Sequence, residues 1–186
     1  MNPPAKKPWN DWFHLIAHVY GSWLRGDPRG WRAVHHRQHV EGDYKNPTPK
    51  GKYDGLYRHS ISLMKRDAVS IAQDLRAIVV EAVVEKLRAD RIEVLVASVD
   101  GKHLHVLGRC RDHKPRSWLG RAKKHTSHSL RQMGLRVEEG GLWARRSWAH
   151  PIGDREHQVN TFHYIAGHEQ KRAAVWRFDR KKAPRS

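Results

Sequence analysis

The alternation of apolar and polar residues along the chain predicts an α+β fold. Residues 12–20 alternate in part, which indicates a first strand. Residues 92–98 and 103–109 are apolar runs on either side of an Asp-Gly turn, so we expect an antiparallel hairpin. Between the first strand and this hairpin, apolar residues recur at helical spacing, which predicts a helix over residues 65–89.

The second half of the chain predicts two more helices and short strands. A basic helix is expected over residues 112–133, followed by short strands over 135–137 and 142–146. Asp154 can cap a last helix that runs to about His168. The resulting order of strands and helices, β-α-β-β-α-β-α, predicts a ferredoxin-like antiparallel sheet with helices on one face.

A chain of 186 residues is expected to form one main domain. Residues 1–11 are expected to be a flexible lead-in, residues 12–176 a single domain, and residues 177–186 a basic tail. Residues 32–58 are polar, rich in His and interrupted by Pro and Gly, so little regular structure is expected there. Three of their imidazoles resemble a metal cluster, although His is also common in polar loops: His35, His36 and His39.

The charge of the chain changes the picture most. It has 36 Lys and Arg against 19 Asp and Glu, a net charge of +17. A globular protein this basic usually meets a polyanion, with nucleic acid as the default partner and an acidic membrane surface as the runner-up. The sequence has no long apolar stretch and no export signal, so we expect no membrane partner and a cytoplasmic location. The single cysteine, Cys110, excludes an intrachain disulfide framework and a multi-cysteine zinc site.

Basic and aromatic residues are candidates for DNA contacts. Cations bind phosphates, whereas aromatic rings between cations are suited to stacking on unpaired bases. The expected DNA-binding cations are Arg25, Arg29, Arg32, Arg116, Arg121, Lys123, Lys124 and Arg131. The aromatic candidates are Trp23, Trp31, Trp118 and Trp148.

The second strand of the hairpin carries a pair of imidazoles. His103 and His105 are separated by one residue, so on a strand they point to the same face while Leu104 packs on the other. Two neutral imidazoles on a rigid strand can begin a divalent-metal site. Asp100, just before them, is interpreted as a turn residue only.

The last helix offers a phenol and a third imidazole. Tyr164 and His168 are four positions apart and therefore share a helical face. Three imidazoles can hold a divalent cation with positions left open, and the phenol is then a candidate nucleophile. His163 and Gln170 compete with His168 for the third position, and Glu169 could add a carboxylate.

These two motifs, in this order, resemble those of the single-tyrosine transposases of the HUH superfamily, including the REP-associated tyrosine transposases. Residues 102–107 look like the paired-histidine strand, and residues 164–168 look like the nucleophile helix with its third ligand. Residues 21–30 are also similar to relatives of this group, so the resemblance spans about residues 12–176. Many members carry Gln where this chain has His168, which bears on metal preference.

The resemblance implies a ferredoxin-like sheet with a C-terminal tyrosine-bearing helix beside it. It implies that Tyr164 cleaves and rejoins single-stranded DNA at hairpin-flanked sites through a 5′-phosphotyrosine intermediate. His103, His105 and His168 would hold a divalent metal, Mg²⁺ or Mn²⁺. Both a homodimer and a monomer are compatible with it.

Two other functions stay open at this point. The basic charge and the Trp–Arg pattern would also suit a non-catalytic protein that binds hairpin DNA or RNA. A small metal-dependent nuclease that uses water in place of the phenol is the third hypothesis.

Overall fold

The computed structural model describes residues 7–28, 49, 51–135 and 140–179. The chain divides into two compact units, one made of residues 1–19 and 70–186 and the other of residues 20–69. The first unit contains the sheet, and the second contains helix α1 (Asp54–Ser62).

The first unit is built on one sheet of five strands. They are β1 (Trp12–Val19), β2 (Glu93–Val99), β3 (His103–Arg109), β4 (Trp143–Pro151) and β5 (Ala174–Arg177), in the order β4-β1-β3-β2-β5. Every neighbouring pair is antiparallel. Helix α2 (Arg76–Ala89) precedes the β2–β3 hairpin and helix α3 (Pro115–Gln132) follows it. This arrangement confirms the predicted α+β, ferredoxin-like fold.

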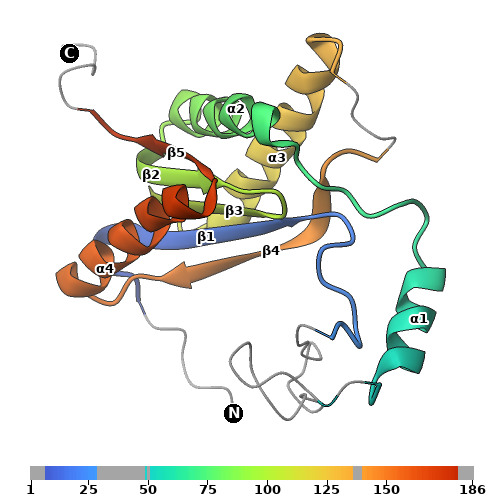
Figure 1. The fold of residues 1–186 in the computed structure, drawn as a ribbon. Coiled ribbons are helices and arrows are strands. Elements are labelled where there is room, and N and C mark those ends of the chain that lie inside the picture. The colour runs from blue at the N-terminus through green and yellow to red at the C-terminus, as the bar shows by residue number, and fades with distance from the viewer. Residues whose placement is uncertain (1–6, 29–48, 50, 136–139, 180–186) are drawn as a thin grey trace. The chain divides into compact units, whose positions relative to one another are not determined.

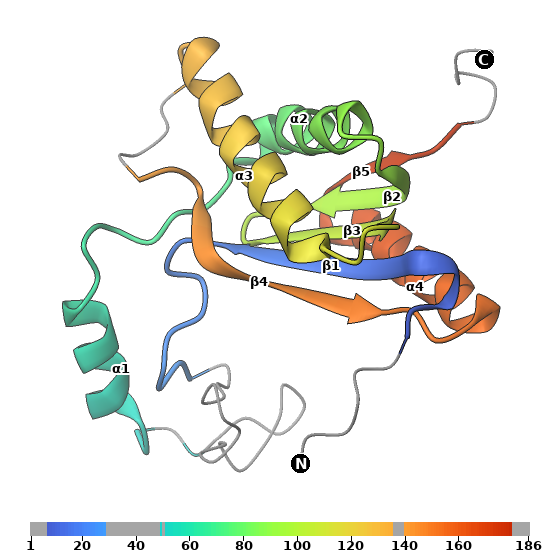
Figure 2. The ribbon, with the colours of Figure 1, turned by 180° about the vertical axis from the view of Figure 1, so that it is seen from behind.

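Strand alternation gives the sheet two different faces. Leu15 and Ala17 of β1 are fully buried, as are Leu104 and Val106 of β3, which pair with them in register. α2 and α3 cover this apolar face, in agreement with the prediction (Figures 1 and 2). Burying side chains of this kind is the main stabilising contribution available to the domain.

Helix α4 (Arg155–Ala166) packs on the opposite face, against β2 and β3 (Figure 1). The side chain of Asp154 accepts a hydrogen bond from the backbone N–H of His157 at 2.7 Å, so it is the predicted N-cap. Ile165 anchors the helix in an apolar cluster with four other buried residues, Trp12, Val96, Leu107 and Ile152. The expected C-terminal helix that carries the tyrosine is therefore present beside the sheet.

The predicted helix over residues 65–89 is wrong at its start. α2 begins at Arg76, after a 3₁₀ turn, η2 (Gln73–Leu75). Residues 69 and 71 are not helical because the N–H of Val69 donates to the carbonyl of Tyr20 and that of Ile71 donates to the carbonyl of Gly101. Hydrogen bonds to distant parts of the chain thus override the helical spacing of these side chains.

α1 lies partly within the segment, residues 32–58, for which little regular structure was expected. Gly26 packs directly against it within the second unit. A Cβ added to Gly26 would approach the backbone nitrogen of Tyr57 to 2.5 Å, and its φ of +83° favours glycine. The Ser60 hydroxyl donates to the carbonyl of Arg25 at 2.8 Å, which ties the preceding loop to the helix.

Three smaller differences concern the ends of the sheet. The strand expected over 142–146 continues to Pro151, while most of the one over 135–137 lies outside the described residues. α4 ends at Ala166 and a 3₁₀ turn, η3 (Gly167–Lys171), follows before β5, which was not predicted. Another short 3₁₀ turn, η1 (Trp9–Asp11), precedes β1.

Within the described residues, no helix is both long and apolar enough to span a membrane.

Candidate functional site

Four imidazoles from β1 and β3 lie on the face of the sheet that carries α4. His18 pairs directly with His103, and Ile16 pairs with His105, so the alternating residues His14, His18, His103 and His105 share one face. The rings of His18 and His103 are 5.0 Å apart, and those of His14 and His105 are 5.2 Å apart. The pairing of β1 with β3 therefore brings the predicted histidine pair into a larger cluster.

His105 is held by its neighbour on β1. Its Nδ1 lies 3.0 Å from Nε2 of His14, so one of these nitrogens donates a hydrogen bond to the other. Burial, followed by the nearby imidazoles, lowers the pKa of His105 far below its usual range. Burial and the charge of His150 likewise lower the pKa of His14 to about 4. Both rings are neutral near pH 7, the state in which an imidazole can bind a metal.

His103 is held by Asp100. The Nδ1 of His103 lies 3.0 Å from the Asp100 carboxylate, which also accepts the backbone N–H groups of Lys102 and His103, each at 2.6 Å. Burial alone would raise the pKa of Asp100, but these hydrogen bonds outweigh it and hold the pKa well below the usual range. The interpretation of Asp100 as a turn residue only is thus incomplete, since the same carboxylate orients an imidazole.

α4 and η3 bring the phenol and the third imidazole to this cluster. The ring of Tyr164 lies 4.7 Å from that of His168, 5.6 Å from that of His105 and 6.0 Å from that of His14. The rings of His105 and His168 are stacked at 4.8 Å, and both residues are only 8% exposed. Tyr164 is 53% exposed, so its ring contacts the imidazoles while the residue stays accessible. His103 lies at the margin of this group, 6.2 Å from His105 between ring centroids.

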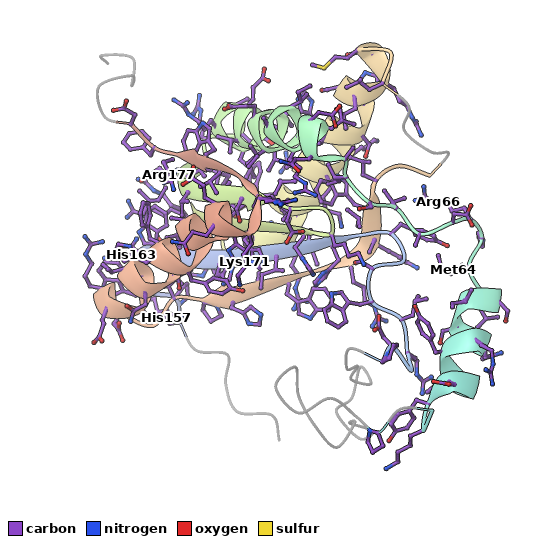
Figure 3. All side chains as sticks on the ribbon, viewed as in Figure 1. Met64, Arg66, His157, His163, Lys171 and Arg177 are labelled. Atoms are coloured by element: carbon purple, nitrogen blue, oxygen red, sulfur yellow. The ribbon has the colours of Figure 1, made fainter. Side chains whose placement is uncertain are left out.

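The alternatives to His168 point elsewhere. His163 is exposed on α4, where Figure 3 labels it, and its ring packs against Phe162. Gln170 is exposed, and the Glu169 carboxylate accepts a hydrogen bond from Arg177 at 2.6 Å. None of these three makes a contact with the imidazole cluster comparable to the stacking of His168.

Neutral imidazoles are suitable ligands for a divalent cation, but the distances between these side chains are not those of a formed metal site. Among the described residues, no three His, Cys, Asp or Glu side chains are close enough to hold a metal ion as they stand. Each predicted ligand nevertheless uses Nδ1 for a neighbour: His103 for Asp100, His105 for His14, and His168 for the carbonyl of Tyr164 at 2.9 Å. Such partners fix a ring so that Nε2 is the coordinating nitrogen.

The basic residues that were predicted on α3 to bind DNA do not lie at this cluster. Arg116, Arg121, Lys124 and Arg131 are exposed on α3, which packs on the opposite face of the sheet. Arg25 is exposed in the second unit, while Arg29 and Arg32 lie outside the described residues.

Lys123 is not placed for the predicted DNA contact. It is 7% exposed, and its ammonium donates to the carbonyl oxygens of Ala144 at 2.7 Å and Arg145 at 3.4 Å on β4. Burial lowers the pKa of this ammonium. A buried amine must be hydrogen-bonded, and these two bonds meet that need. They also link α3 to β4.

Two residues of the cluster escaped the sequence analysis, His14 and His18. The signal was present: both alternate with apolar residues on β1, so they share a face. What was missing was the register, because only the pairing of β1 with β3 shows that this face is also that of His103 and His105.

Comparisons with known proteins found a matching family model and a similar solved structure. The model of a protein family described as "Transposase IS200 like" matches residues 52–168, which is more than half of the 186 residues. Among solved structures, the chain is similar to one described as "Structure of the REP associates tyrosine transposase bound to a REP hairpin". That likeness covers 92% of this chain and 74% of the other, with 14% identity and a TM-score of 0.43. No curated protein sequence matches the chain at a significant level.

Proposed function

The chain belongs to the family of IS200-like transposases, and we propose that it cleaves and rejoins single-stranded DNA with Tyr164 as the nucleophile. The observation that supports this proposal is the placement of an accessible phenol against two buried imidazoles, His105 and His168. A helix tyrosine with a purely structural role would bury its ring and leave its hydroxyl at the surface, whereas Tyr164 is 53% exposed and its ring lies against His105 and His168.

The proposed reaction is a reversible transesterification. The Tyr164 oxygen loses its proton and attacks the phosphorus of a phosphodiester. The bond to the 3′ oxygen breaks, and that oxygen takes up a proton. One strand leaves with a 3′-hydroxyl, and the other is linked to the protein as a 5′-phosphotyrosine. A second 3′-hydroxyl can then attack this linkage and release the tyrosine, so rejoining needs no nucleotide cofactor.

A divalent cation, Mg²⁺ or Mn²⁺, would be held by His103, His105 and His168. When bound, it would neutralise charge on a non-bridging phosphate oxygen and orient the phosphorus for attack. The chain's own contribution is to orient the three rings through Asp100, His14 and the carbonyl of Tyr164.

The proposed substrate is single-stranded DNA next to a hairpin, in a cytoplasmic setting and with either one or two copies of the chain. A net charge of +17 favours a polyanionic partner. Exposed cations on α3 and in the second unit, Arg116, Arg121, Lys124, Arg131 and Arg25, are the proposed phosphate contacts. Arg29 and Arg32 are proposed on the sequence alone.

The second candidate is a non-catalytic protein that binds hairpin DNA or RNA. One observation favours it: the described residues contain no group of three ligands already spaced for a metal ion. Charge and exposed aromatic residues would serve such a binder equally well.

The experiment that tests the proposal is capture of the covalent intermediate. Wild-type protein and Tyr164→Phe are incubated with a labelled pool of hairpin oligonucleotides that carry random single-stranded flanks, with Mn²⁺ or Mg²⁺. We expect a protein–DNA adduct from the wild type, and a loss of roughly 10⁴-fold or more in Tyr164→Phe, the scale seen when a nucleophile is removed.

Three outcomes separate the candidate functions. An adduct that persists in Tyr164→Phe would falsify the assignment of the nucleophile. Release of a free 5′-phosphate without any adduct would favour a nuclease that uses water. Tight binding by the wild type with no cleavage under any metal condition would favour the non-catalytic binder.

A further inference from the structure

Strand β4 presents an exposed row of polar and aromatic side chains on the same face as the imidazole cluster. Trp148 and His150 pair with Ile16 and His14 of β1, so they share the face of His14. Arg146 precedes them on β4, in the stretch where the register between β1 and β4 shifts. These three residues, Arg146, Trp148 and His150, are called the β4 row below. All three are exposed, and β4 is an edge strand.

The structure separates Trp148 from the other aromatic candidates that it describes. Trp118 lies on α3, on the opposite face, where its indole N–H donates to Asp112 at 2.8 Å and Arg121 covers its ring at 3.8 Å. Trp23 belongs to the second unit, and Trp31 lies outside the described residues. Trp148 is therefore the one of the four that shares a face with Tyr164 within the first unit.

Trp148 is also joined to the imidazole cluster by ring contacts. Its ring lies 5.0 Å from that of His18 at 85°, and His18 lies 5.0 Å from His103. Trp148 and His105 both pair with Ile16, on either side of it. Their backbones are thus two strand spacings apart, about 10 Å. Trp148 is 41% exposed and its ring is packed against His18, so it offers an accessible aromatic face beside the imidazole cluster.

We propose that Trp148 stacks on an unpaired nucleobase of the DNA strand whose phosphate reaches Tyr164. The strand would cross the exposed edge of the sheet, where Arg145 and Arg146 supply exposed cations for its backbone. An aromatic ring beside a cation is the pattern that holds single strands without reading their sequence. This inference rests on the proposed function, because it concerns the substrate of the same site.

The composition of the β4 row favours a nucleic acid over a second copy of this chain. Both Arg145 and Arg146 are exposed immediately before Ser147 and Trp148. A second copy would bring the same cations to the same edge, and its net charge is also +17. A polyanion, in contrast, is attracted to this charge.

The test compares two labelled probes: an oligothymidylate, and an abasic oligonucleotide of the same length and charge. Affinities are measured by fluorescence anisotropy in the Tyr164→Phe background. We expect that protein to prefer the probe with bases, and Trp148→Leu to lose roughly 10-fold or more of that preference. Binding of the abasic probe should stay unchanged, because the phosphates and cations are the same.

Two variants control for the chemistry and for folding. Trp148→Phe keeps an aromatic face and should retain most of the preference. Phe178→Leu removes an equally exposed aromatic residue, 41% in both cases, that is not a predicted DNA contact, and should leave the preference intact. Thermal unfolding of each variant checks that the sheet is still formed.

The proposal is overturned if Trp148→Leu retains the preference for bases, or if Trp148→Leu changes the oligomeric state instead of base binding. It is also overturned if Phe178→Leu loses the preference equally. These readouts need no cleavage, so they are independent of adduct formation. An intact adduct with no effect at Trp148 would refute only the stacking site, whereas base binding without an adduct would refute only the catalytic proposal.

Discussion

The two faces of the sheet use the same strands for opposite purposes. On the face covered by α2 and α3, Leu15, Leu104 and Val106 are fully buried and no polar side chain interrupts β1 or β3. On the face covered in part by α4, the same strands carry His14, His18, His103 and His105. The period of two residues in a strand allows this separation without any change of backbone.

The difference shows how the fold can tolerate a buried polar cluster. Imidazoles are costly to bury as cations, and the lowered pKa values of His14 and His105 reflect this cost. The apolar face offsets this cost by hydrophobic burial, through residues that are adjacent to the histidines in sequence, such as Leu104 between His103 and His105. The comparison predicts that substitutions on one face chiefly alter stability and that substitutions on the other chiefly alter chemistry.

The largest expected effect in stability is that of Leu104→Ala. Leu104 is fully buried beneath the helices, so its truncation should lower the free energy of unfolding by about 2–5 kcal/mol. Guanidinium titration measures this value, and adduct formation per folded molecule should be unchanged. His105→Ala is the matched variant on the other face, and it should abolish adduct formation at a smaller cost in stability. A reversed order of the two stabilities would break the comparison between the faces.

The next effect tests how one imidazole supports another. His14→Gln removes the ring nitrogen 3.0 Å from His105 Nδ1 and should weaken Mn²⁺ binding by about 10- to 100-fold. Titration calorimetry measures the affinity. His150→Gln is the control, because His150 also neighbours His14, at 6.4 Å between rings, but has no bond to a predicted ligand. Equal weakening in both variants would mean that general electrostatics, and not the hydrogen bond, supports His105.

The smallest effect separates two adjacent lysines on α3. Lys123→Met removes the donor to the Ala144 carbonyl and should lower the free energy of unfolding by about 1 kcal/mol. Lys124→Met, at an exposed position, should leave stability unchanged and slightly weaken DNA binding at low salt. Chemical denaturation and anisotropy report the two quantities. If Lys123→Met weakened DNA binding more than Lys124→Met, the original prediction of a phosphate contact would be restored.

Local patterns were sufficient to predict most of the fold. β1, the β2–β3 hairpin, α3 and the capped α4 each follow from periodicity, turn residues or a cap within a short window. The start of α2 was missed because a hydrogen bond from Ile71 to Gly101 decides the local backbone. β5 was missed because its four residues are too few to display a period.

The residues of the candidate site also divide into those that a short stretch of sequence reveals and those that only the folded structure reveals. His103, His105, Tyr164 and His168 could be singled out because each pair lies within five residues of sequence. His14 could not, since its bond partner His105 is 91 positions away and only the register reveals it. The burial of Lys123 had a signal that was overlooked, because Lys123 lies on the stripe of α3 formed by Leu119, Ala122 and Leu130.

The cap at Asp154 has a consequence for how this protein can vary. It fixes where α4 starts, and the helix then carries Tyr164 around its axis in steps of about 100° per residue. A single insertion between these two positions would swing the phenol off the sheet and into solvent. An insertion just before Asp154 would leave the direction of Tyr164 around the helix axis unchanged relative to the cap. Length changes within the first three turns of α4 should therefore be rejected.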